Sequence, residues 1–81
     1  MDSIQKIIAM NAIRLRNERG LTKKDVARRA GVSLLAYSNI EAGKINPKMK
    51  TIYMIAEAMG VGVQEFLSPI EESTDVSFRE G

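Results

Sequence analysis

The stretch GVSLLAYSNIEAGKINP, residues 31–47, contains both ends of one short helix. Gly31 suits a turn that needs a positive φ, and Ser33 is a favoured N-cap, so we expect a helix from Ser33 to about Ala42. The Gly-Lys-Ile-Asn-Pro segment that follows closes the helix, because glycine favours helix ends and the residue before a proline avoids helical geometry.

The two faces of this expected helix differ in an unusual way. Tyr37 and Ile40 recur at the spacing of a buried helical face. Leu34 and Leu35 stand in the first turn, on the opposite face, where a polar side chain would be ordinary. The purpose of these two leucines is the main question that the stretch raises.

The residues before Gly31 predict another helix packed against this one. Thr22 is a good N-cap, and Asp25 stands at the N3 position of a capping-box-like start. The apolar side of that helix comprises Val26, Ala27 and Ala30. The unit from Thr22 to Ala42 therefore consists of a helix, a glycine-containing turn and a capped helix, which is the helix-turn-helix geometry.

Three more helices are expected, over residues 4–19, 48–59 and 63–67. Asp2 and Ser3 can cap the first, and Gly20 can end it. The buried positions expected for the first and fourth helices are Ile4, Ile8, Ala12 (or Asn11), Leu15, Ile52, Ile55, Ala56 and Met59. We expect one all-α domain over residues 1–69, with an acidic, polar tail at 70–81 that is either disordered or a short strand.

Composition argues against an enzyme. Among 81 residues there is neither histidine nor cysteine, which removes the commonest general base, thiolate nucleophiles and the usual zinc ligands. No Gly-rich phosphate loop or pair of acids on one helix face is present, so we expect no cofactor and no metal. No apolar run reaches the roughly 18 residues of a membrane span, and Met1 to Met10 does not resemble a signal peptide, so a cytoplasmic location without a membrane partner is expected.

Charge is unevenly distributed along the chain. Residues 1–50 contain eleven of the twelve lysines and arginines but only four of the ten acids, a net charge of +7. Residues 51–81 contain one base and six acids, a net charge of −5. This polarity favours a basic face that meets a polyanion and an acidic end kept away from it, although a solvated surface with accidental asymmetry would look the same.

Five short motifs in order resemble the phage-repressor and Cro-like helix-turn-helix regulators. They are RLRNERGLT (14–22), ARRAGVS (27–33), IEAG (40–43), NP (46–47) and IAEAMGV (55–61), within a similarity that runs from about Asn11 to Leu67. No single motif is diagnostic, but five with these gaps are specific. The resemblance implies a compact, lambda-repressor-like domain of five helices that forms a homodimer, binds a palindromic operator and regulates transcription.

The same resemblance assigns roles to individual residues. The third helix would read bases, and flanking residues would contact the DNA backbone, adding affinity without sequence information. The base-reading residues are Ser33, Leu34, Leu35, Ser38 and Asn39. The backbone contacts are Thr22, Lys23, Lys24, Lys44, Lys48, Lys50 and Arg16, although the lysines could equally be ordinary solvated side chains.

Leucine cannot hydrogen-bond a base edge, so three interpretations of Leu34 and Leu35 stay open. They could contact thymine methyl groups in an operator rich in A·T pairs. One could be buried against the preceding turn while the other is a tolerated surface residue. Alternatively, this face could meet another protein, with DNA binding weakened or lost.

Two further expectations concern packing. Similar proteins pair an arginine near the end of the first helix with the glutamate of the IleGlu step, which implies an Arg16–Glu41 ion pair of mainly structural role. The family commonly dimerises through its last helix, so the apolar surplus there is interpreted as a dimer interface. Its residues are Val63, Phe66, Leu67, Ile70 and Met54, with Tyr53 possible at the edge, although Phe66 could equally close the core.

The sequence thus favours a small, dimeric, sequence-specific regulator that binds double-stranded DNA, as a repressor or controller protein. The chief alternative is a protein-interaction module, such as an antitoxin or the partner of another regulator, with polymerase or a toxin among conceivable partners. Leu34 and Leu35 favour that alternative, and the +7 charge of residues 1–50 opposes it.

Overall fold

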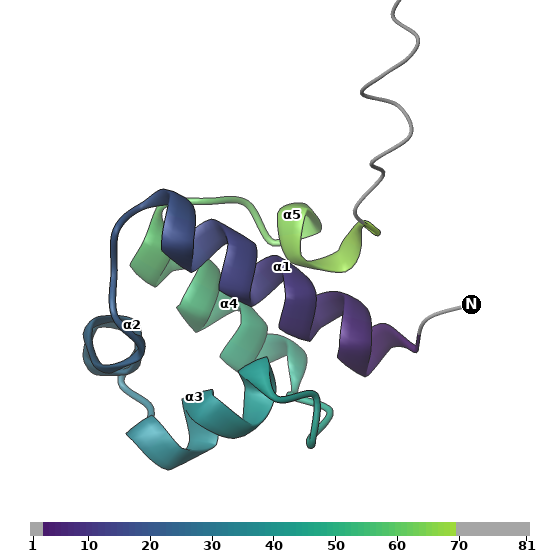
Figure 1. The fold of residues 1–81 in the computed structure, drawn as a ribbon, viewed down its shortest axis with the longest axis horizontal. Coiled ribbons are helices and arrows are strands. Elements are labelled where there is room, and N and C mark those ends of the chain that lie inside the picture. Colours follow the sequence, from purple (N-terminus) through teal and green to yellow (C-terminus); the bar gives the residue numbers. More distant parts are fainter. Residues whose placement is uncertain (1–2, 70–81) are drawn as a thin grey trace, which may run out of the picture.

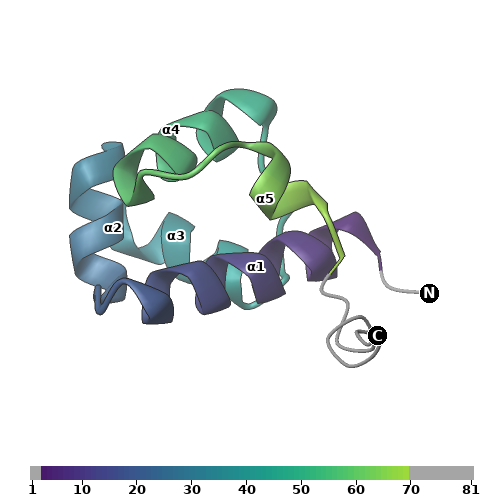
Figure 2. The same cartoon turned by 90° about the horizontal axis from the view of Figure 1, so that it is seen from above.

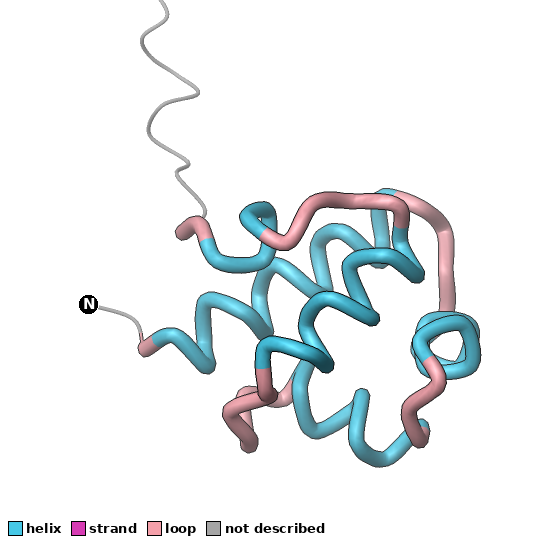
Figure 3. The backbone as a smooth tube through the Cα atoms, turned by 180° about the vertical axis from the view of Figure 1, so that it is seen from behind, coloured by secondary structure: helices cyan, strands magenta, loops and turns pink. Residues whose placement is uncertain are grey.

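The computed structural model describes residues 3–69, and all regular structure in that range is helical (Figures 1 and 3). The helices are α1 (Ile4–Glu18), α2 (Lys23–Ala30), α3 (Leu34–Glu41), α4 (Met49–Met59) and α5 (Gln64–Leu67). The expected all-α fold of five helices is confirmed. The strand considered for the tail lies outside the described residues, as does Ile70. No helix of this part of the chain combines the length and apolar character needed to cross a membrane.

Hydroxyl side chains cap the starts of the first three helices, as expected. The hydroxyls of Ser3 and Ser33 each accept a hydrogen bond from the backbone amide three residues on, at 3.2 and 3.0 Å. Thr22 and Asp25 form the full capping box, with both reciprocal bonds at 3.0 Å. Each cap satisfies amides that the helix itself leaves unpaired, and is worth about 1 kcal/mol.

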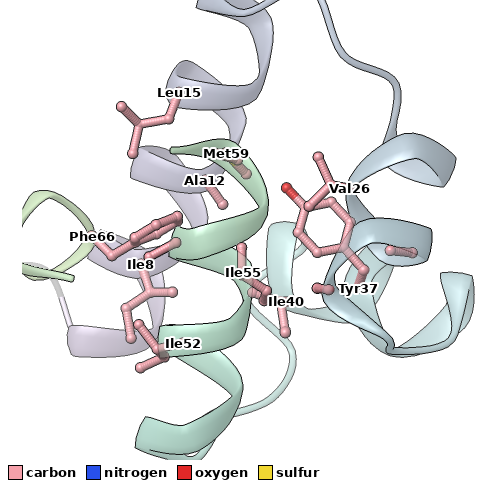
Figure 4. Packing of buried hydrophobic residues seen from close by; sticks show 13 residues of the cluster. Ile8, Ala12, Leu15, Val26, Tyr37, Ile40, Ile52, Ile55, Met59 and Phe66 are labelled. Atoms are coloured by element: carbon pink, nitrogen blue, oxygen red, sulfur yellow. The ribbon is translucent and has the colours of Figure 1, made fainter. Parts of the chain in front are cut away.

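The helices enclose one core. In Figure 1, α2 is seen end-on while α3 runs across the view, so the two consecutive helices cross at a steep angle. α4 packs beside α2, and α1 packs against both α3 and α5 (Figure 2). Side chains from all five helices meet in the space between them (Figure 4). The larger ones include Ile8, Leu15, Val26, Tyr37, Ile40, Ile52, Ile55, Met59 and Phe66.

The expected buried stripe of α1 is confirmed from Ile8 onward but not at its first position. Ala12 and Asn11 are both fully buried, whereas Ile4 is 44% exposed. The amino-terminal turn of α1 projects past the neighbouring helices, so no other helix packs over it (Figure 2).

Asn11 is buried because it holds α5 and the chain after it. Its Nδ2 donates to the carbonyl oxygens of Phe66 at 2.9 Å and Ser68 at 2.7 Å. These bonds place α5 against α1 and direct the Phe66 ring inward beside Ile8, where only 1% of the residue is exposed (Figure 4). The assignment of Phe66 to a dimer interface is therefore corrected, since its side chain belongs to the core of a single chain.

Candidate nucleic-acid interface

The turn between α2 and α3 sets the angle between these two helices. Gly31 takes φ = +74°, a left-handed conformation that suits glycine, and its amide donates to Arg28 O at 3.2 Å. The amide of Val32 donates to Ala27 O at 3.0 Å, which satisfies another carbonyl at the end of α2. Ser33 then caps α3 immediately, so a short, hydrogen-bonded connection joins the two helices.

Three side chains anchor α3 to α1. Arg16 Nε donates to Glu41 Oε2 at 2.6 Å, and Arg16 Nη2 donates to Glu41 Oε1 at 3.1 Å, forming a bidentate ion pair. The hydroxyl of buried Tyr37 donates to the same Oε2, and Arg16 Nη1 donates to Leu21 O at 2.9 Å. The Glu41 side chain is 3% exposed and that of Arg16 is 15% exposed. We call Arg16, Tyr37 and Glu41 the anchor.

The anchor has clear electrostatic consequences. The hydrogen bonds that Arg16 donates to Glu41, reinforced by the negative charge of the carboxylate, raise the pKa of Arg16 and keep the guanidinium charged. Burial raises the pKa of Tyr37 well above its ordinary value, and the Glu41 carboxylate beside it adds to the effect. The phenol therefore stays protonated and donates to the carboxylate throughout the physiological pH range.

The exposed face of α3 contains no charge. Leu34 is 48% exposed and Leu35 71% exposed, while Ser38 and Asn39 are half-buried. Neither leucine is buried, which excludes the interpretation that one packs against the preceding turn. The side-chain amide of Asn39 has no hydrogen-bond partner within residues 3–69. Ser33 is exposed at the start of the helix, but its hydroxyl already serves as the cap.

Exposed lysines lie before and after α3 along the chain. Lys23 and Lys24 begin α2, and Lys44, Lys48 and Lys50 follow α3 in the connection and first turn of α4. In the described part of the chain none of the five forms an ion pair. We call the uncharged exposed side of α3 together with these five lysines the basic face.

The backbone adds anion-binding groups at the start of α2. The amides of Lys23 and Lys24 are not engaged by the capping box, so they remain free to meet an anion at the positive end of the helix. Arg16 contributes less, because Glu41 and Leu21 O engage all three of its guanidinium nitrogens. Its terminal nitrogens each keep an N–H group that could still reach a phosphate.

The residues assigned to a dimer interface do not form a single patch. Val63 and Leu67 are half-buried and pack against the core from the α5 side. Met54 instead lines a groove of about 340 Å³ between α2 and α4, which also includes Arg29 and Glu57.

Sequence reasoning missed Met49, which is 58% exposed one turn before Tyr53 on the outer side of α4. Tyr53, which the sequence placed at the edge of the interface, is itself 53% exposed. The four-residue spacing between Met49 and Tyr53 on one side of α4 could have identified Met49 as well.

A capped recognition helix, a bracing helix and a lysine-flanked neutral face define a helix-turn-helix DNA-binding domain. A family model described as helix-turn-helix matches residues 13–66. The chain is 39% identical over 70 residues to an uncharacterized HTH-type transcriptional regulator of Sinorhizobium fredii, covering 86% of this chain and 91% of that protein. The chain belongs to the helix-turn-helix family of transcriptional regulators, which are DNA-binding proteins and not enzymes.

Two other relatives illustrate the breadth of the similarity. The cryptic phage CTXφ transcriptional repressor of Vibrio cholerae is 36% identical over 61 residues, covering 75% of this chain and 55% of that protein. The crystal structure of a hypothetical transcription factor from Neisseria superposes with a TM-score of 0.83 at 24% identity, covering 91% of this chain and 85% of that one. This structural likeness shows the shared fold.

The anchor predicts a specific loss of stability in alkali. Because the pKa of Tyr37 is raised in the folded state, the unfolded chain releases this proton first as the pH rises. The resulting stability is fully present below about pH 10 and falls above it by up to about 1.4 kcal/mol per pH unit. We expect Tyr37→Phe to remove this part of the pH dependence of urea unfolding, followed by circular dichroism. The exposed control Tyr53→Phe should remove far less, and an unchanged slope in Tyr37→Phe would contradict the assignment.

Proposed function

We propose that this protein binds a specific operator in double-stranded DNA through α3 and represses or controls transcription there. The observation that carries the proposal is the basic face, in which an anchored helix has an uncharged exposed side and the lysines before and after it form no ion pair within residues 3–69. Such an arrangement separates two tasks. The five lysines of the basic face provide affinity for any duplex, and the exposed side chains of α3 determine which sequence is preferred.

In this proposal α3 lies in the major groove and α2 crosses the DNA backbone. Asn39 can accept from and donate to an adenine edge, and Ser38 can bond to more than one base. The amides and side chains of Lys23 and Lys24 meet phosphates on one side of the groove. The three lysines after α3 meet phosphates on the other side, and the anchor keeps α3 at a fixed angle between them.

We further propose that two copies bind together. A twofold dimer would place two recognition helices about 34 Å apart, one turn of DNA, and would read a palindromic site. After Phe66 is assigned to the core, Val63 and Leu67 remain available for this contact at α5, with Met54 and Tyr53 available on α4. A dimer on promoter DNA would exclude polymerase, in keeping with the similarity to a phage repressor.

One observation favours a second function. Leu35 is exposed to 71%, which is unusual for a leucine, and it would suit a face that binds another polypeptide. A module whose main partner is a protein would bind DNA weakly and without a preferred sequence. The experiment below therefore also separates the two functions.

Selection of bound duplexes from a random pool tests the proposal, followed by titration across salt. We expect one enriched, palindromic sequence and a steep fall of affinity with salt. Lys24→Ala should weaken binding to all sequences and reduce the slope of log K against log salt by about 0.9, the effect of one phosphate contact. No enriched sequence, or an affinity that salt leaves unchanged, would refute the DNA-binding function.

Arg14→Ala is the matched control for this loss of one positive charge. Arg14 lies two residues before Arg16 on α1, so it projects from nearly the opposite side of that helix, where it contacts Asn11 and Glu18. Its removal should leave the salt slope unchanged.

Sedimentation tests the dimer. We expect the wild-type protein at micromolar concentration to sediment at twice the 9.0 kDa of a single chain. Leu67→Glu places a charge at a half-buried position of α5, so it should yield monomers that bind the operator less tightly. Helical circular dichroism retained in the variant would separate loss of the dimer from loss of the fold. A wild-type protein that sediments as a single chain under these conditions, with unchanged operator affinity in the variant, would contradict the dimer.

A further inference from the structure

The chemistry available on α3 is restricted in a way that bears on what the helix can recognise. Its sequence, LLAYSNIE, contains a single carboxylic acid, Glu41, and no lysine or arginine. Glu41 is buried and neutralised by Arg16, so it does not reach the surface. The commonest specific contact to DNA, an arginine or lysine on guanine, is therefore absent from α3 itself. The surface left for base contacts is made of two leucines, a serine and an asparagine.

The leucines occupy the most exposed part of that surface. Leu34 and Ser38 are four residues apart, as are Leu35 and Asn39, so each leucine stands one helical turn before a polar side chain on the same face. Both leucines lie in the first turn of α3, the end of a recognition helix that contacts base edges. A base contact by Asn39 would therefore bring Leu35 close to a neighbouring base pair.

The only alkyl group that a base presents in the major groove is the C5-methyl of a pyrimidine. Thymine has this methyl, whereas uracil and cytosine lack it. Methylation of cytosine at C5 places an equivalent methyl at the same position of the ring. When a leucine side chain covers such a methyl, the buried apolar surface makes the free energy of binding more favourable. The gain does not depend on whether the methyl belongs to thymine or to 5-methylcytosine.

The surroundings favour DNA over a protein as the occupant of this face. The five lysines before and after α3 form no ion pair within residues 3–69, and positive charge on both sides of α3 along the chain suits the two phosphate backbones of a major groove. An apolar protein surface would leave those charges without partners.

We propose that Leu34 and Leu35 make α3 a reader of C5-methyl groups, so that operator binding responds to methylation of cytosine as well as to thymine. This inference rests on the proposed function, and it deepens it by naming the chemical group that is recognised. Methylation of operator cytosines beneath the leucines then strengthens binding, and loss of a thymine methyl weakens it.

The test is a set of duplexes based on the selected operator, in which each pyrimidine in turn is thymine, uracil, cytosine or 5-methylcytosine. Thymine and uracil differ only in the methyl, as do 5-methylcytosine and cytosine. At positions beneath the leucines we expect about a fourfold gain in affinity from the methyl in both comparisons, the ordinary value of burying one such group. Equal gains in the two comparisons show that the methyl itself is recognised.

Protein variants locate the effect. Leu34→Ala and Leu35→Ala should each reduce the gain at their own position to about twofold or less, and because both side chains are exposed, the fold should persist by circular dichroism. Asn39→Ala is the matched control on the same face. It should lower affinity for the operator while leaving the methyl gain intact.

The possible outcomes distinguish a failure of methyl recognition from a failure of DNA binding itself. An enriched operator whose affinity is the same with and without each methyl would overturn methyl recognition and leave DNA binding in place. A methyl gain that persists in both leucine variants would assign the effect to other residues and equally overturn the inference. Failure to enrich any sequence would overturn both, and would favour a protein as the partner of the leucines.

Discussion

The orientation of α3 depends on the ion pair between Arg16 and Glu41. A carboxylate that is 3% exposed would be strongly unfavourable alone, and here it accepts from two guanidinium nitrogens and from the Tyr37 hydroxyl. The same arginine also holds the carbonyl of Leu21, just before α2 begins. One cluster therefore fixes α1, the entry to α2 and the end of α3 relative to one another. Its main contribution is orientation, since a buried ion pair offers little net stability over apolar packing.

Because the anchor and the core residues hold α3 in place, the exposed side chains of the helix are not needed for its packing. Tyr37, Ile40 and Glu41 provide the packing and the ion pair from the inner side. On the outer side Leu34 and Leu35 are exposed, and the side-chain amide of Asn39 forms no hydrogen bond within residues 3–69. α3 itself contains no lysine or arginine, so non-specific attraction and base selection reside in different side chains. The two can then change independently, by substitution of a lysine in one case and of a leucine or Asn39 in the other.

The local elements could be predicted from sequence because their causes are local. Thr22, Ser33 and Gly31 determine helix ends through hydrogen bonds and a backbone conformation that involve only their neighbours. Three-residue and four-residue spacing likewise identified Tyr37 and Ile40 as buried. The Arg16–Glu41 pair joins residues 25 positions apart, and only the resemblance to a family suggested it.

What escaped prediction depends on tertiary packing. Periodicity placed Ile4 on the buried stripe, but it does not indicate where the neighbouring helices end. Phe66 could have faced the core or a partner, and the decision comes from Asn11, whose two bonds to the chain around α5 were not foreseen. The exposure of Leu34 and Leu35 was equally undetermined, because it depends on how closely the preceding turn approaches them.

The central claim is that Arg16 and Glu41 act as one unit that orients α3. A double-mutant cycle of Arg16→Ala and Glu41→Ala tests it most directly, with urea unfolding and operator selection measured on all four proteins. We expect Glu41→Ala alone to cost about 3 kcal/mol, and the double variant to cost at least about 1 kcal/mol less than the sum of the two single changes. The folded variants should bind the wild-type operator less tightly, because α3 is no longer held at a fixed angle, but they should still prefer its sequence, because the side chains that select bases are unchanged. Additive losses within about 0.5 kcal/mol, or a single change that alters the selected sequence without loss of stability, would contradict the account.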